Sequence, residues 1–173
     1  MAGRPVELEL FGNHEALERP GKIHSRGWCD PEQTVRRISA CDAAYLPYWF
    51  ERRRREVVEV SFPGKLAMYA AARLPVFYHG PAYGSPVKFL ERFPFGKVCA
   101  TLRPDAIAAK LSAFVSDGGW LTAARAASDR AYEAELSAAV FRERFARLLG
   151  VDSEALLALE SGEIEPESLR VRG

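Results

Sequence analysis

Short apolar segments that alternate with helix signals are the feature that most restricts the fold of this 173-residue chain. The segments "AAYLPY", "PVFY" and "GKVCAT" lie between stretches of helical periodicity, and each is followed by a turn or loop. Strands this apolar are typical of parallel sheets that are covered on both faces. The alternation therefore predicts the α/β class, with a mostly parallel sheet and helices on both of its faces.

The expected elements follow from periodicity and from end signals. Asp30, Pro31 and Gln33 form an explicit helix start, and Ser85-Pro86 opens another helix in the same style. An apolar stripe within residues 120–149 predicts one long helix or two with a bend, with a structural role. The remaining predicted helices cover 65–73, a segment of about three turns from Asp105, and a short stretch after Gly150; the strands cover 6–12, 22–28, 43–48, 75–78 and 96–101.

Composition and charge exclude several classes of protein. With 24 Lys and Arg against 23 Asp and Glu, the formal charge is +1, so no overall field favours nucleic acid or an anionic membrane. The three cysteines and three histidines are too far apart for a metal site or a disulfide framework. No apolar run is long enough for a transmembrane segment. We therefore expect a cytoplasmic, metal-free protein that does not bind nucleic acid.

The sequence "SFPGKLAMYAAARLPVFYHGP", residues 61–81, places a loop, an alanine-rich helix and an apolar strand in succession. It resembles the donor-binding signature in the C-terminal domain of GT-B-fold glycosyltransferases of the retaining, group 1 type, where a loop S-F-P-x-K-L precedes a helix E-Y-L-A-A-G and a strand L-P-V. The flanking segments "LFG", "GW", "CDAAYLPY" and "PDAIAAKLSAFVSD" fall in that family's order. The resemblance covers residues 6–149. It implies a Rossmann-like domain over residues 1–149, incomplete at its N-terminal edge, followed by a short helix and charged tail over 150–173.

The resemblance also implies that the helix start behind the loop holds the diphosphate of a nucleotide-sugar donor. Backbone N–H groups and the helix dipole favour an anion there. Gly64 would let the backbone approach the phosphates, and Lys65 would add a point charge. The alternative is that Lys65 is an ordinary solvated lysine. The full set of implied donor-binding residues is Gly12, Trp28, Cys29, Ser61, Phe62, Pro63, Gly64, Lys65, Met68 and His79.

Three positions depart from the family's pattern. The ribose-binding glutamate of the family corresponds to Met68, and a second acidic residue directed at the donor sugar corresponds to Val60. The glycine that usually precedes L-P-V is Arg73, a cation that a helix C-terminus accepts. These departures leave the expected fold intact and weaken the expectation of tight donor binding.

The expected function is that of a glycosyltransferase C-terminal domain that binds a nucleotide-diphosphate sugar as substrate, with no separate cofactor. The chain begins at the equivalent of the family's second strand, so we expect a second polypeptide or self-association to complete it, and little activity alone. No catalytic residue is assigned. The alternative is a non-catalytic Rossmann-like interaction module or a degenerate fragment of a glycosyltransferase.

Three further features have two interpretations each. The cluster "ERRRRE" at residues 51–56 follows "LPYWF" and is either a solvated loop or a surface that contacts an acceptor, a lipid carrier or a missing domain. His79 stands at a strand end and is either a donor contact or a structural hydrogen-bonding residue. Trp28 either borders the nucleotide base or is simply buried.

Overall fold

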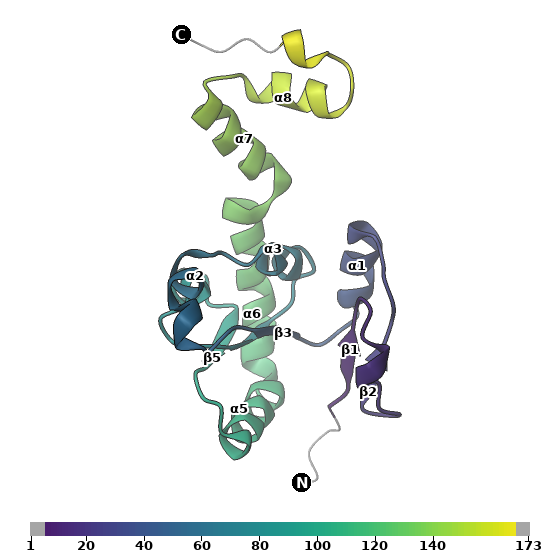
Figure 1. Cartoon of the computed structure of the whole chain (residues 1–173), viewed down its shortest axis with the longest axis vertical. Coiled ribbons are helices and arrows are strands. Elements are labelled where there is room, and N and C mark those ends of the chain that lie inside the picture. Colours follow the sequence, from purple (N-terminus) through teal and green to yellow (C-terminus); the bar gives the residue numbers. More distant parts are fainter. Residues whose placement is uncertain (1–5, 169–173) are drawn as a thin grey trace.

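A computed structural model of the chain describes residues 6–168 (Figure 1). Strands and helices alternate through its first two thirds, and the last third is helical. The strands are β1 (Leu8–Leu10), β2 (Ile23–Ser25), β3 (Ala44–Pro47), β4 (Val76–His79) and β5 (Gly96–Cys99). The α-helices are α1 (Pro31–Ile38), α2 (Arg55–Val60), α3 (Gly64–Ala71), α4 (Ser85–Arg92), α5 (Pro104–Ser116), α6 (Gly118–Ala131), α7 (Ala138–Leu149) and α8 (Ser153–Glu160).

The strands form two small parallel sheets. One has the order β1-β2 and the other the order β3-β4-β5, and every strand pair within them is parallel. The α/β class and the parallel pairing predicted from the sequence are therefore confirmed. The strands do not, however, join into a single sheet, and this arrangement is compatible with a Rossmann-like fold without establishing it.

The outer edge of β3 explains why the larger sheet stops there. Ala44 and Tyr48 donate their backbone N–H groups to the β4 side, so Tyr45 and Pro47 present their backbone groups to the free edge. Proline has no N–H to donate, and the hydroxyl of Tyr69 on α3 donates to the Tyr45 carbonyl at 3.3 Å. Part of the hydrogen-bonding capacity of this edge is therefore missing at Pro47 or satisfied by Tyr69, which disfavours pairing with a further strand.

Helices cover both faces of the three-stranded sheet. On one face, Val76 and Tyr78 of β4 pack with Leu66 and Ala70 of α3 and with the buried alanines of α6. On the other face, Phe77 packs against Phe114 of α5, with ring centroids 5.4 Å apart. Alternate residues of β4 thus point into two separate apolar layers, as expected for a strand buried on both faces.

Helix-end chemistry read from the sequence agrees with the structure at α1, and the chain beyond α3 has an unusual backbone conformation at Arg73. The Asp30 carboxylate accepts from the backbone N–H of Gln33 at 2.7 Å, as the capping signal predicted. Arg73 lies two residues beyond the end of α3, has φ = 56°, and is the one non-glycine residue with positive φ among residues 6–168. Glycine is the usual residue in this conformation because a Cβ is strained there.

The segment over residues 120–149 is two helices with a bend. α6 runs into a π-helical turn, η3 (Tyr132–Leu136), and Ser137 is extended before its hydroxyl caps α7. α7 and α8 pack together through a small core of Ala146, Val151 and Leu156. In Figure 1 this hairpin extends beyond the α/β part of the molecule.

Candidate functional site

The loops at the carboxyl ends of β3 and β4 are tied together at one backbone carbonyl. The Tyr48 hydroxyl and the Ser85 hydroxyl each donate to the carbonyl of Ser61, both at 2.6 Å. Tyr48 follows β3, Ser61 begins the predicted diphosphate loop, and Ser85 is the first residue of α4. These bonds place the start of α3 beside the start of α4, at the edge of the sheet where α/β proteins bind ligands.

Two glycines allow the loop after β4 to pack tightly on buried Tyr78. A Cβ on Gly80 would lie 2.5 Å from Cβ of Tyr48, and a Cβ on Gly84 would overlap the Tyr78 hydroxyl. That hydroxyl donates to the Pro81 carbonyl at 3.0 Å, and burial raises the pKa of Tyr78 well above its usual value. The uncharged Tyr78 hydroxyl therefore holds this loop through its hydrogen bond to the Pro81 carbonyl.

The helices that start at this edge differ from the others in how they begin. α3, α4 and α5 have no side-chain cap, whereas the other described helices of eight residues or more are capped by Asp or Ser side chains. The start of α5 carries the Arg103–Asp105 ion pair at 2.6 Å, so an acidic side chain already lies there. The starts of α3 and α4 have no acidic residue in the first turn. Both leave their positive dipole ends without an anionic partner among residues 6–168.

Lys65 stands in the first turn of α3 with its side chain exposed. It makes no hydrogen bond or ion pair with any residue that the structure describes. A Cβ placed on neighbouring Gly64 would meet no atom within 4 Å, so the packing of the chain does not itself require glycine there. The space in front of both residues is open to a ligand.

The remaining residues of this stretch lie around the same helix start. Phe62 is 42% exposed and its ring meets that of Phe89 edge-on, with centroids 5.1 Å apart. Pro63 occupies the N-cap position of α3, and Met68 packs partly against the main core. Val60, the position where the family commonly carries an acid, is 80% exposed. The structure thus brings all six predicted residues from Ser61 to Met68 to one place.

His79 is occupied by structural hydrogen bonds. Its Nε2 lies 2.7 Å from the Thr101 carbonyl, and its Nδ1 lies 2.7 Å from the Tyr45 hydroxyl. A carbonyl only accepts, so Nε2 donates to the Thr101 carbonyl. Both ring nitrogens are therefore used within the chain, as in the structural interpretation of this residue.

Gly12, Trp28 and Cys29 lie in the segments that follow β1 and β2 of the two-stranded sheet. Gly12 has φ = 118° and forms an isolated bridge with Gly27, and Trp28 is 84% exposed rather than buried. Cys29 is partly buried. Within residues 6–168, no hydrogen bond or ring contact joins these three residues to the Ser61–Lys65 loop. The structure therefore divides the predicted set between two sheets.

The arginine cluster lies close to the loop and is largely paired. Arg54 stacks over Trp49 at 4.9 Å and Arg55 over Tyr83 at 4.7 Å, measured to the ring centroids. Arg55 also bonds Glu59 at 2.8 Å. These contacts bring part of the positive charge against aromatic and acidic side chains of the same chain.

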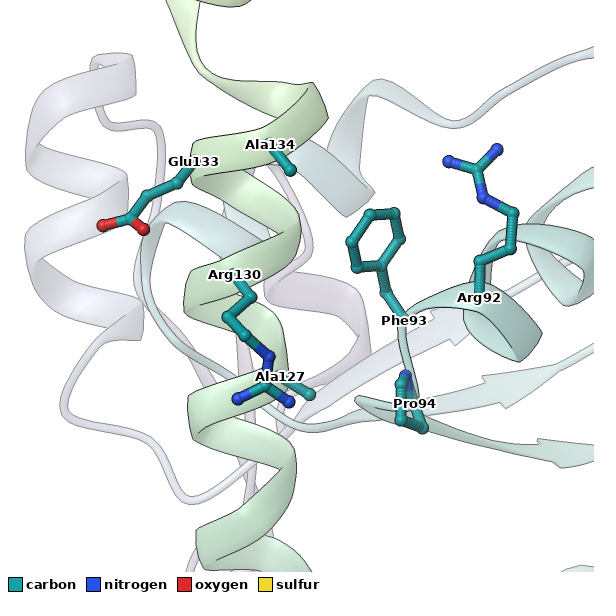
Figure 2. Close-up of a pocket in the computed structure, with 7 residues that line it drawn as sticks. All are labelled: Arg92, Phe93, Pro94, Ala127, Arg130, Glu133 and Ala134. Carbon is teal, nitrogen blue, oxygen red and sulfur yellow. The ribbon is translucent and has the colours of Figure 1, made fainter.

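Two hollows lie away from this edge. The larger, about 560 Å³, is formed by Arg92, Phe93 and Pro94 at the far end of α4 and by residues of α6 and η3 (Figure 2). Figure 2 shows the Phe93 ring directed towards Ala134, with Glu133 pointing away from it. The second, about 370 Å³, lies between β5 and α5. Neither is lined by a predicted donor-binding residue.

Within the described residues, no group of three or more His, Cys, Asp or Glu side chains is arranged to hold a metal ion. None of the helices there has the length and apolar character needed to cross a bilayer.

Two residues that connect the loops of this edge, Tyr48 and Ser85, are not among the predicted donor-binding residues. Tyr48 and Ser85 were recognised only as a strand end and a helix start, although both bond the Ser61 carbonyl. A hydroxyl-bearing residue immediately after a strand or at the first position of a helix is the available signal. The shared acceptor cannot be read from the sequence because it depends on how two loops fold against each other.

Comparison of the chain with protein-family models, with curated proteins and with solved structures finds no match.

Proposed function

We propose that this chain binds the diphosphate of a nucleotide-sugar donor at the starts of α3 and α4, as a glycosyltransferase C-terminal domain of GT-B type. The observation that carries the proposal is the pairing of two uncapped helix starts through the Ser61 carbonyl, beside exposed Lys65. Two positive dipole ends and a lysine suit a ligand with two adjacent phosphates. The sequence motif over residues 61–81 supports the same assignment.

In this proposal the domain contributes electrostatic stabilisation of the leaving diphosphate. Charge develops on the diphosphate as the sugar leaves, and fixed N–H groups and a cation stabilise that charge. The hydrogen bonds from Tyr48 and Ser85 to the Ser61 carbonyl would keep these backbone N–H groups in place before the ligand binds. The residues that act on the acceptor, and any general base, would come from a second polypeptide or domain.

A non-catalytic interaction module is the second candidate. Exposed Trp28, at 84%, is the observation that favours it, because tryptophan is enriched at protein interfaces relative to the rest of a protein surface. Val60 stands where a family member would commonly carry an acid for the donor sugar.

Calorimetric titration of UDP and GDP into the full chain tests the proposal. We expect Lys65→Ala to weaken binding by about 1–3 kcal/mol, as for the loss of a charge-assisted hydrogen bond, and to leave thermal stability nearly unchanged. Lys110→Ala is the matched control, because Lys110 is also an exposed helical lysine but lies on α5. Gly64→Ala should keep or raise stability, since its Cβ meets nothing in the chain, while weakening nucleotide binding.

Equal affinities for wild type and Lys65→Ala would remove Lys65 from the site. If neither nucleotide binds to any of these proteins at millimolar concentration, the interaction module becomes the better assignment.

A further inference from the structure

A row of large apolar side chains on α7 faces solvent. Phe141, Phe145 and Leu148 are 67%, 43% and 79% exposed, and the two phenylalanine rings stack with centroids 5.9 Å apart. Their spacing of four and then three residues places them on one face of the helix, in the pattern of a helix-pairing seam. The sequence predicted a structural role for this stripe, but no described residue of the chain covers it.

The exposed apolar face of α7 is separate from the small core that α7 and α8 share. Ala146 of α7 packs with Val151 and with Leu156 of α8 on a different side of the helix. Leu149 and, on α8, Leu157 are 43% and 50% exposed. The hairpin therefore has a small internal core and also presents apolar surface outwards, at the end of the molecule farthest from α5 in Figure 1.

The exposed surface is large enough to matter for association. At roughly 200 Å² for each fully exposed large side chain, the five apolar residues present on the order of 500 Å² per copy. Two copies that covered this surface would bury about 1,000 Å², which is near the lower limit for a specific protein interface. We therefore expect a dimer of moderate strength rather than an obligate one.

Charge on the hairpin is complementary to a second hairpin of the same kind. α7 carries three arginines and one glutamate, whereas residues 153–168 carry five glutamates and no Lys or Arg. Within one copy, Arg142 of α7 already bonds Glu160 of α8 at 2.9 Å. If α7 of one copy packed against α7 of another, Arg144 of one copy would face Arg144 of the other, and the like charges would repel. An anionic bilayer would repel the acidic residues that follow α7. α7 against the α8 of a second copy avoids both conflicts.

We propose that two copies of this chain associate through the α7–α8 hairpin, with α7 of each copy against α8 of the other. Such a contact is isologous, so the same surface is used twice and the assembly closes at two copies. Two helical hairpins joined in this way form a four-helix arrangement with the apolar stripe in its interior. The association is independent of nucleotide binding at the sheet edge.

Sedimentation equilibrium of the full chain tests the interface. We expect a reversible dimer at concentrations up to about 100 μM, since the fraction dimerised depends on protein concentration. Leu148→Glu should weaken dimerisation tenfold or more, a change of about 1.4 kcal/mol. The control is Leu102→Glu, which adds the same charge at a residue that is 65% exposed outside the hairpin and should leave the dimer unchanged. Circular dichroism checks that both variants are folded.

Complementary charge reversal tests the pairing of α7 with α8. Arg144→Glu with Arg147→Glu, and separately Glu154→Lys with Glu163→Lys, should each dimerise more weakly than wild type. An equimolar mixture of the two double variants should recover association, because acidic α7 then meets a basic partner. A wild-type chain that stays monomeric, equal effects of Leu148→Glu and Leu102→Glu, or a mixture that stays dissociated would each overturn the proposal. Binding of a monomeric chain to phosphatidylserine vesicles would overturn it in favour of a membrane surface.

Discussion

Because the backbone at Arg73 is left-handed, we predict that a glycine variant at this position is more stable than an alanine variant, the reverse of the usual order in helices. Arg73 has φ = 56°, where a residue with a Cβ is strained by about 1–2 kcal/mol. Glycine relieves that strain, although its freer unfolded chain costs about 0.5–1 kcal/mol. We therefore expect Arg73→Gly to be more stable than Arg73→Ala by about 0.5–1 kcal/mol. At an ordinary helical position glycine is less stable than alanine by about 1 kcal/mol.

Comparing two variants removes the contribution of the arginine side chain. Arg73 Nε lies 2.8 Å from Asp129, in a pair whose side chains are 66% and 36% exposed. Both variants lose this pair, which is worth about 0.2–1 kcal/mol at such exposure. Arg125 donates to the Arg73 carbonyl at 3.3 Å, and both variants keep that backbone acceptor. The difference between them therefore reports the backbone alone.

Urea denaturation followed by circular dichroism measures the difference as a shift of the midpoint at constant slope. Ala109→Gly, at an exposed position within α5, is the matched control and should destabilise by about 1 kcal/mol. The prediction is wrong if Arg73→Gly is no more stable than Arg73→Ala while Ala109→Gly behaves as expected. In that case residue 73 does not hold the positive φ in solution.

Two further predictions concern other parts of the fold. Gly84→Ala should destabilise by about 1–3 kcal/mol in urea denaturation, because its Cβ would overlap the buried Tyr78 hydroxyl; a neutral result would show that the loop after β4 moves freely. The pKa of Glu9 is lowered mainly because its carboxylate accepts hydrogen bonds from Arg26. The stability that Glu9 adds to the folded state is therefore present above its unfolded pKa and is lost as the pH falls through its folded pKa. Wild type should therefore lose more stability than Glu9→Gln between pH 7 and pH 3, by under about 1 kcal/mol for so exposed a pair; equal losses would contradict the shift.

The elements that could be predicted from sequence are those specified by local chemistry. Asp30 accepts from the Gln33 backbone as its spacing indicated, and Ser85 begins a helix as the Ser-Pro pair indicated. β4 lies where an uninterrupted apolar run predicted a strand buried on both faces. Each of these signals involves residues within about four positions of one another, so the chain needs no distant contact to define them.

The features that could not be predicted depend on contacts between distant residues. The sheet stops at β3 because of Pro47 and because Tyr69, 24 residues beyond Tyr45 in the sequence, reaches the Tyr45 carbonyl. His79 looked available at a strand end, yet Tyr45 and Thr101 occupy both of its ring nitrogens. The apolar stripe of α7 had the periodicity of a core helix, and periodicity alone does not say whether another element covers it.

The uncapped helix starts bear on whether the sheet edge evolved to hold a ligand. A capping side chain contributes about 1 kcal/mol, and the chain uses one at α1, α6, α7 and α8. At α3 and α4 the N-cap residues are Pro63 and Gly84, which provide no side-chain acceptor. Among the described helices of eight residues or more, the three without a side-chain cap are α3, α4 and α5, which follow the strands of the larger sheet. Asp105 already lies in the first turn of α5, so the proposed diphosphate would supply acceptors at α3 and α4, where no acidic first-turn residue does so.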